Sequence, residues 1–391
     1  MNKIIVDQKE FVSLFSLRDR KNINQYLHAI ELSKTVSNKS EIARIINQAN
    51  RTVQSWIKNE QIPIAVRAIN ELKENNLLPL VENNNSDAFN LFVEIFAFIY
   101  GDGSLKKDLF GFDLFGQKQD LSLMKREFEE RFDFKTKIIA NKTVGEITKE
   151  NKGIIFTRPV VGSVYRLRVY SSQFAKLLYL AGAPKGDKVA QPTSVPSWLM
   201  NSSKETKRRF LSVLFGNELQ CPQLRAKNAF TSPQFGLHKI ESKQSELKIF
   251  LEQIKQLLNE FGISTSPISF EKCKTIRKDG NHSMKLYFHI DSHSPNILHL
   301  FKEIPFKYAE EKQKRFEKAV QQFLKNSEHL KHEWKLYEKV LEMHSNGLGR
   351  RTIFKKLELP KKYFYKINAW IHYGNKPLYY EEREILFSFN P

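Results

Sequence analysis

Apolar residues recur at helical spacing near both ends of the chain. Residues 39–63 read as two short helices around a polar turn, and Pro63 ends the unit. This spacing predicts a helix-turn-helix, although a generic helical hairpin produces the same pattern. The positions predicted to point inward are Ile42, Ala43, Ile46, Val53, Trp56 and Ile57.

Residues 345–377 carry a second pattern of this kind, with a turn at Pro360 between two apolar helices. The positions predicted to point inward are Ile353, Leu357, Phe364, Ile367 and Trp370. The basic residues of this segment are Arg350, Arg351, Lys355, Lys356, Lys361, Lys362 and Lys366. A solvated helical cap could have this composition, but the clustering around one helix favours a second helix-turn-helix.

The middle of the chain repeats the order helix, strands, helix, strands, helix. The first copy begins with an apolar helix at 92–100, and the second begins with one at 208–220. Because 116 residues separate Asp102 from Glu218, the pattern indicates a duplicated domain rather than a solenoid of short repeats. The remaining predicted elements are 110–117, 121–132, 134–142 and 164–184 in the first copy, and 234–240, 245–262, 270–290 and 295–304 in the second. A segment with three prolines, 182–199, is predicted to connect the copies.

Several strands of this middle part alternate between basic and apolar residues. In residues 164–170, Arg166 and Arg168 fall on one face of the strand and their apolar neighbours on the other. In residues 284–290, Lys285 likewise shares a face with two aromatic residues. The sequence therefore predicts sheets with one basic face.

Composition narrows the class of protein. The chain has 391 residues, a formal net charge of +20 and a sequence pI of about 9.6, which favours a polyanionic partner such as nucleic acid. Hydrophobic residues make up 41%, enough for folded cores. Two cysteines predict neither a disulfide framework nor a cysteine-based zinc site. With no signal-peptide core and no apolar run of about 18 residues, we expect a cytoplasmic protein without a membrane span.

One acid stands at an unusual place. Residues 92–105 are almost wholly apolar until Gly101-Asp102-Gly103. Glycines often cap helices, but an aspartate at the C-terminal end of a helix opposes the helix dipole. This position favours a functional role for Asp102.

These stretches resemble the LAGLIDADG (DOD-type) homing endonucleases, of the single-chain, two-motif kind seen in archaea. The first motif is residues 95–103, with the small Ala97 at its third position and Asp102 as its acid. The second is residues 211–219, with Glu218 as its acid. The second motif departs from the family pattern: Val213 replaces the small residue and Leu219 the final glycine. The resemblance covers about residues 88–324.

The resemblance implies an α+β fold with two pseudo-symmetric αββαββα lobes, whose antiparallel sheets form a saddle, flanked here by all-α helix-turn-helix domains. The domain boundaries follow as 1–84, 85–200, 201–330 and 331–391. A working monomer is expected, because both lobes lie in one chain. The residues expected to contact double-stranded DNA are Arg166, Arg168, Lys135, Lys137, Lys274, Arg277, Lys285, Lys361 and Lys362.

The resemblance also implies a metal site between the lobes. Asp102 and Glu218 would hold Mg²⁺ or Mn²⁺, and the backbone carbonyls of Gly101 and Asn217 would add ligands. The other implied catalytic residues are Gln117 and Lys118 in the first lobe and Lys239 in the second. Gln117 would orient a water molecule, and the lysines would stabilise charge on the phosphate.

The function predicted in this way is a site-specific, metal-dependent endonuclease that cuts double-stranded DNA. Two alternatives remain open: a catalytically inactive, DNA-binding transcription regulator built on the same core, and a maturase that binds intron RNA. An intein is not expected, because the chain begins with Met and ends in Ser-Phe-Asn-Pro, without a His-Asn splice terminus.

Overall fold

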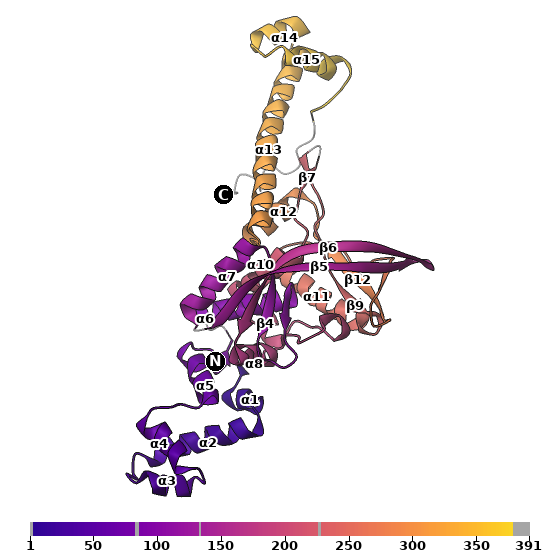
Figure 1. Cartoon of the computed structure of the whole chain (residues 1–391). Coiled ribbons are helices and arrows are strands. Elements are labelled where there is room, and N and C mark those ends of the chain that lie inside the picture. Colours follow the sequence, from indigo (N-terminus) through magenta and orange to yellow (C-terminus); the bar gives the residue numbers. More distant parts are fainter. Residues whose placement is uncertain (1–2, 83–85, 133, 226–227, 378–391) are drawn as a thin grey trace.

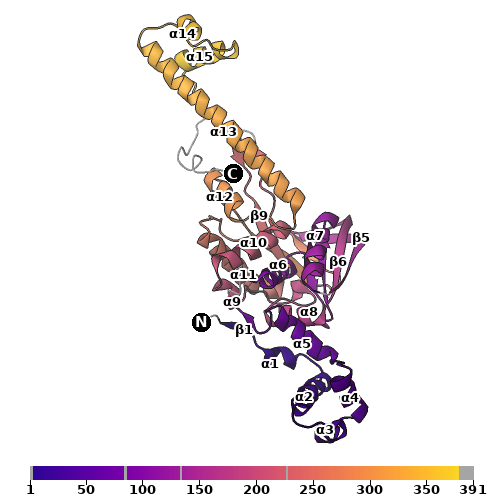
Figure 2. The same ribbon diagram turned by 90° about the vertical axis from the view of Figure 1, so that its left-hand side faces the viewer.

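The computed structural model describes residues 3–82, 86–132, 134–225 and 228–377. The molecule is elongated, with a helical unit at each end of a central body of helices and strands (Figure 1, Figure 2). The helices and antiparallel sheet of this body confirm the predicted α+β class. No helix within these described ranges combines the length and apolar character that a membrane span requires.

The N-terminal unit is a group of helices closed by a short pair of strands. Its elements are β1 (Ile4–Val6), α1 (Gln8–Ser13), α2 (Leu17–Leu32), α3 (Lys39–Ile45), α4 (Asn50–Lys58), α5 (Ile64–Glu74) and β2 (Leu80–Val81), which pairs with β1. The buried residues that α2, α3 and α4 bring together are Ala29, Ile42, Ala43, Ile46, Val53 and Trp56. Ile57 is only partly buried against them. The predicted domain boundary at 84 falls within 83–85, outside the described residues.

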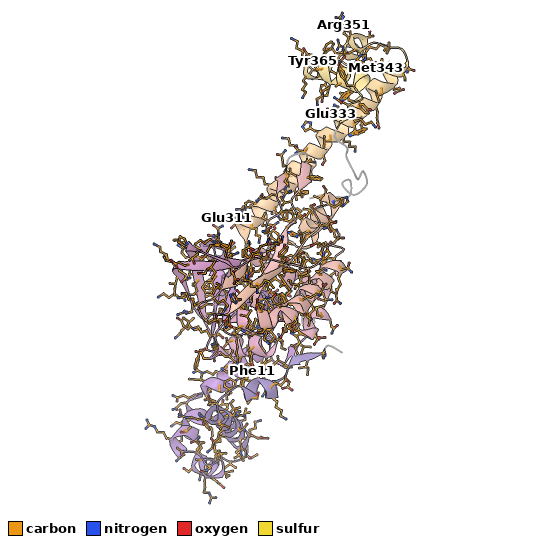
Figure 3. The ribbon with its side chains drawn as sticks, turned by 90° about the vertical axis from the view of Figure 1, so that its right-hand side faces the viewer. Phe11, Glu311, Glu333, Met343, Arg351 and Tyr365 are labelled. Atoms are coloured by element: carbon orange, nitrogen blue, oxygen red, sulfur yellow. The ribbon has the colours of Figure 1, made fainter. Side chains whose placement is uncertain are left out.

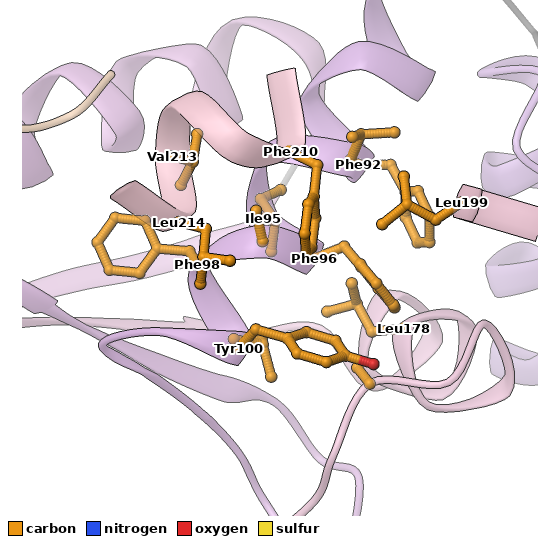
Figure 4. Packing of buried hydrophobic residues seen from close by; sticks show 14 of the residues in the cluster. Phe92, Ile95, Phe96, Phe98, Tyr100, Leu178, Leu199, Phe210, Val213 and Leu214 are labelled. Atoms are coloured by element: carbon orange, nitrogen blue, oxygen red, sulfur yellow. The ribbon is translucent and has the colours of Figure 1, made fainter. Parts of the chain in front are cut away.

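Two helices form the centre of the body. These are α6 (Asp87–Tyr100) and α10 (Lys204–Glu218), and a serine side chain caps the first turn of each, Ser86 on the N–H of Phe89 and Ser203 on that of Thr206. Because apolar residues occupy nearly every side of α6, this helix must be surrounded by protein. Figure 4 shows Phe96 and Phe98 of α6 beside Phe210 and Leu214 of α10. The predicted apolar helices of both copies therefore pack against each other.

One antiparallel sheet of eight strands joins the two copies. Its strands are β3 (Gly103–Leu105), β4 (Phe112–Gly116), β5 (Lys135–Asn151), β6 (Ile154–Tyr170), β9 (Gln234–Ile240), β10 (Ser269–Phe270), β11 (Lys274–Ile276) and β12 (His282–His289). The order runs β3-β4-β6-β5 in the first copy and continues through β11 to β12, which pairs with both β9 and β10. The junction is the pairing of Thr275 with Lys149 and its two neighbouring pairs. A second, small sheet pairs β7 (Leu224–Arg225) with β8 (Ala229–Phe230).

The hairpin of β5 and β6 is longer than the sequence pattern predicted. The basic strand expected at 134–142 continues to Asn151, and β6 begins at Ile154. Its register is continuous, so side chains alternate without interruption between the two faces. Leu167 and Val169 are fully buried on the face that packs on helices. The helices that complete the body are α7 (Lys118–Arg131), α8 (Ser172–Leu180), α9 (Ser197–Met200), α11 (Gln244–Glu260) and α12 (Ser294–Glu303).

A single long helix carries the C-terminal unit. It is α13 (Glu310–Ser345), and α14 (Arg350–Lys356) and α15 (Lys362–His372) pack against its far end. The buried residues of this unit are Leu336, Tyr337, Val340, Ile353, Ile367 and Trp370. Of the other positions predicted to point inward, Leu357 is only partly buried and the ring of Phe364 lies 5.2 Å from that of Phe354.

Candidate functional site

The ends of α6 and α10 approach each other closely. A Cβ atom added at Gly101 would lie 2.9 Å from the Cβ of Asn217, a separation that real side chains do not adopt. Gly103 is equally confined, because a Cβ there would lie 2.7 Å from the carbonyl oxygen of Phe98. Val213 and Leu219, where the second motif departs from the family pattern, are both buried in this contact region. The larger residues are thus accommodated without separating the helix ends.

This contact brings the two predicted acids close enough to influence each other. Burial, and after it the charge of Asp102, raise the pKa of Glu218 to about 7 against the opposing charges of Lys188 and Lys312. Desolvation by the surrounding protein also raises the pKa of Asp102, although its side chain keeps contact with solvent. Two carboxylates with raised pKa values therefore lie within electrostatic reach of each other, which is the electrostatic setting of a cation site.

Two cavities open on either side of the acid pair. The larger, about 670 Å³, is lined by Asp102, Gln117 and Asn217 among others. The smaller, about 240 Å³, is lined by Glu218 and Gly101 with residues of β9. Each cavity is therefore lined by one acid, by the residue that precedes the other acid, and by the end of a strand. In both cavities this strand belongs to the same copy as the acid that lines the cavity.

Two lysines that sequence reasoning missed lie against the helix ends. Lys188, in the connector, donates from Nζ to the carbonyl oxygen of Gly101 and, at 3.1 Å, to that of Ile99. Lys312, in the first turn of α13, donates to the carbonyl oxygens of Phe215 at 2.8 Å and Gly216 at 2.9 Å.

Burial lowers the pKa of both lysines, in the case of Lys312 to about 8, while the two acids oppose that shift. Each lysine follows the last helix of its own copy, which is the one signal in the sequence that could have identified them.

The other predicted catalytic residues divide into two groups. Gln117 lines the larger cavity, whereas Lys118 begins α7, is exposed, and lines neither cavity. Lys239 is only 3% exposed, and its ammonium donates to Thr193 Oγ1 and to the carbonyl oxygens of Lys188 and Gln191. Lys239 therefore holds the turn of the connector that carries Lys188.

The donor set suits a hard divalent cation. Carboxylates and backbone carbonyls are the ligands that Mg²⁺ and Mn²⁺ accept, usually with water and substrate phosphate completing the shell. The carbonyl oxygen of Gly101 already accepts a hydrogen bond from the ammonium of Lys188, so a metal ion bound there would share this oxygen with that group. Nδ2 of Asn217 is buried beside the acids without a hydrogen-bond partner among the described residues; as an N–H donor it would bind an acceptor such as a phosphate oxygen and not the cation. In the same part of the chain, no cluster of three or more His, Cys, Asp or Glu side chains forms an alternative site.

Predicted DNA-contacting residues of the first copy share one face of the sheet. Lys137 pairs with Arg168 and Lys135 with Tyr170, so both lysines lie on the face opposite the buried Leu167. Asp113 holds Arg168 through two bonds of 2.9 and 3.3 Å and lies 3.9 Å from Arg166. The hydrogen bond to Asp113 raises the pKa of Arg168. Arg168 is thus fixed in direction before any ligand binds.

Residues of the second copy continue this face. Lys285 pairs with His238 across β9 and β12 and donates to Gln234 at 2.8 Å. Lys285 is also close enough to lower the pKa of Glu218.

The two other predicted contacts of the second copy already have partners. Lys274 forms an ion pair with Glu241, and Arg277 lies 2.6 Å from Asp187 of the connector. Lys361 and Lys362 stand at the start of α15, which lies far from both copies in the C-terminal unit (Figure 1).

No protein-family model matches the chain. The chain is 28% identical over 304 residues to DNA-directed RNA polymerase subunit Rpo1N of Methanocaldococcus jannaschii, covering 76% of this chain and 21% of that protein. It is 28% identical over 216 residues to the tRNA-splicing ligase RtcB of Pyrococcus furiosus, covering 54% of this chain and 21% of the ligase. It is 24% identical over 255 residues to the replication factor C small subunit of M. jannaschii, covering 63% and 13%. The chain therefore spans about a fifth or less of each relative.

Among solved structures, the chain is similar to variants of the homing endonuclease I-DmoI and to I-DmoI in complex with DNA and Ca. The TM-scores are 0.32 and 0.31 at 12% identity, and each match covers 55% of this chain and 89% of the other. Likeness at this level does not establish a shared fold.

Proposed function

We propose that the protein is a metal-dependent endonuclease that cuts double-stranded DNA at specific sites. The observation that carries this proposal is the pair of acids, Asp102 and Glu218, at the touching ends of two buried helices. Basic side chains, including Arg166, Arg168 and Lys285, cover one face of the sheet that begins beside these acids. Basic side chains on a curled antiparallel sheet suit contacts in the major groove.

The residues would divide the work of phosphodiester hydrolysis. Asp102, Glu218 and the carbonyl of Gly101 would hold Mg²⁺ or Mn²⁺, which supplies an activated water and stabilises the leaving oxygen. Gln117, in the cavity that contains Asp102, would orient the attacking water. Lys188 and Lys312 would offset the negative charge of the acids and the phosphate. Lys118 would contact the DNA backbone from the first turn of α7.

The sequence relatives support this proposal indirectly. A polymerase subunit, a ligase and a replication factor have unrelated activities, and in each the similarity spans about a fifth of the protein or less. A segment shared by proteins with such different activities is not expected to be the part that performs any one of those activities. A unit that moves between genes, as the DNA of a homing endonuclease does, accounts for this distribution.

We further propose that the two copies are the pseudo-symmetric lobes of a LAGLIDADG enzyme. On this proposal, residues 85–200 and 201–330 are the lobes, each lobe contributes one acid, and a monomer cuts both strands. The close approach of Gly101 and Asn217 is what such paired motif helices require.

The test is cleavage of a randomised duplex library with Mg²⁺ by the natural chain, Asp102→Asn and Glu218→Gln. We expect defined cuts that disappear in both variants, while Glu130→Gln, an exposed acid of α7, cuts normally. Selective retention of duplex without cutting by the natural chain would support the regulator instead. Preference for structured RNA over duplex would support the maturase.

A further inference from the structure

The two terminal units are built on the same plan. In the N-terminal unit, the ring of Tyr26 lies 5.6 Å from that of Trp56 at an interplanar angle of 78°. In the C-terminal unit, Tyr337 and Trp370 lie 5.7 Å apart at 83°. In both, the tyrosine comes from the longer first helix and the tryptophan from the third. The two cores thus repeat one edge-to-face contact.

The turns between the second and third helices also match. Asn47 follows α3 by two residues with a φ of 52°, and Glu358 follows α14 by two residues with a φ of 48°. Few residues other than glycine adopt this left-handed conformation. The spacing from Ile42 to Asn47 equals that from Ile353 to Glu358, and both isoleucines are fully buried. We infer that the units are two copies of one three-helix module.

The C-terminal copy is held away from the body. Its core is a separate cluster, and the 36 residues of α13 span about 54 Å at 1.5 Å per residue. Figure 1 and Figure 2 show α14 and α15 at the far end of α13, which is called the arm below. Figure 3 places Arg351 and Tyr365 at this end. A ligand bound by the C-terminal copy therefore lies outside the site formed by Asp102 and Glu218.

Charge distinguishes the two copies. Residues 346–377 contain eight Lys and Arg residues and one acid, whereas residues 39–62 contain four and two. Within the C-terminal copy, Arg350 is engaged with Phe364 and Asn368, and Lys366 with Glu333.

The remaining basic residues and an exposed tyrosine belong to the same unit. Tyr365 is 78% exposed on α15. The exposed cations of this unit without a carboxylate partner in the described part of the chain are Arg351, Lys355, Lys356, Lys361, Lys362 and Lys376. Cations that lack acidic partners, interleaved with an exposed aromatic ring, form a surface suited to a phosphate backbone and bases.

We propose that the C-terminal copy is a second surface for duplex DNA, with α15 entering the major groove. This rests on the proposed function only in taking DNA as the ligand. The major groove of B-form DNA admits a helix, whereas that of A-form RNA is too narrow for side chains to read. The arm lets this copy contact DNA up to about 16 base pairs from the acids, at 3.4 Å per base pair. The target site would then be longer than the sheet alone can cover.

The test compares binding to a duplex of about 60 base pairs and one of about 20, both of mixed sequence, across a salt series without divalent metal. The variant carries Lys355→Gln, Lys356→Gln, Lys361→Gln and Lys362→Gln in the full chain. A control makes the same charge change along the exposed arm: Lys314→Gln, Lys318→Gln, Lys325→Gln and Lys335→Gln. Circular dichroism confirms that each variant remains folded.

On the long duplex, we expect the variant to lose affinity about tenfold or more and the salt slope to fall by about 2 to 4. The short duplex, bound by the sheet, should show no change, and the control should resemble the natural chain. Equal losses on both lengths, an equal loss in the control, or a loss confined to an RNA competitor would each overturn the proposal. Because cleavage is not measured, an inactive acid pair cannot affect the result.

Discussion

Gly101 and Asn217 touch where α6 and α10 end, with room for no atom between the α-carbon of the glycine and the side chain of the asparagine. Each residue immediately precedes one of the paired acids. The contact therefore sets how far apart Asp102 and Glu218 can be, and it does so with backbone and short side chains that have little freedom to move.

Gly101→Ala should separate the helix ends. The added methyl would lie 2.9 Å from the Cβ of Asn217, so we expect a loss of about 1–3 kcal/mol in the free energy of unfolding, measured in urea. Asn217→Gly in the same chain should restore part of the loss by removing that Cβ. Gly145→Ala is the control, because a Cβ there meets nothing within 4 Å. Equal effects at positions 101 and 145 would contradict the prediction.

Glu94 should be one of the most costly acids to replace. It is 1% exposed in α6 and bonds to Arg209 at 3.1 Å, to Lys307 at 2.7 Å and to the hydroxyl of Tyr308 at 2.9 Å, all from the second copy or just beyond it. Glu94→Ala removes the carboxylate that these three groups share, while Arg209 keeps Glu205 and Tyr308 keeps Glu127, so we expect a loss of about 1.5–3 kcal/mol.

Glu130→Gln, whose acid is exposed beside Arg126, should change stability by less than about 0.5 kcal/mol. Urea unfolding of both variants measures the difference. A similar small loss at Glu94 would show that its network does not hold the copies together.

Stability of the metal-free protein should fall as pH rises through the titration of Glu218. Its pKa is raised from 4.5 to about 7, so between these values the folded chain holds a proton that the unfolded chain has released. Because the folded state binds this proton more tightly than the unfolded state does, the proton stabilises the folded state at low pH. This stabilisation is lost as the pH rises from about 4.5 to about 7.

Glu218→Gln cannot titrate, so its free energy of unfolding should decline less between about pH 5 and about pH 8, measured with a chelator present. The same decline in both proteins would rule out Glu218 as the source. Glu246, a partly exposed acid whose pKa is lowered to about 2, provides the matched control as Glu246→Gln.

Lys118 and Lys239, predicted as a catalytic pair, should respond differently to replacement by methionine. Lys239→Met removes three hydrogen bonds to the connector and leaves buried acceptors, so we expect a loss of about 1–3 kcal/mol in stability. Lys118→Met changes an exposed side chain and should lower cleavage with less than about 0.5 kcal/mol of destabilisation. Unfolding and cleavage assays on both variants separate the two roles. Loss of cleavage without destabilisation in Lys239→Met would restore it as a direct participant.

The sequence by itself determined which side of each element is buried. Local periodicity placed Arg166 and Arg168 opposite Leu167, and it placed Ile42 and Ile353 in the cores of their units. It also identified Asp102, because an acid directly after an apolar helix stands out in the sequence even when its partner Glu218 is not known. These patterns depend only on residues within a few positions of one another, so the fixed periods of helices and strands make them recognisable in the sequence.

Only the tertiary structure decided which distant residues meet. Lys188 and Lys312 bind carbonyl oxygens from segments about 90 residues earlier in the chain, and backbone acceptors leave no mark in the sequence. The pairing of β5 with β11 joins the two copies through three residue pairs that no alternation specifies. Nothing near Lys239 in the sequence indicates burial, and it is buried only because the connector packs over it. Burial periodicity is encoded locally, whereas these contacts join segments far apart in the chain and are defined only by how α6, α10 and the two copies pack together.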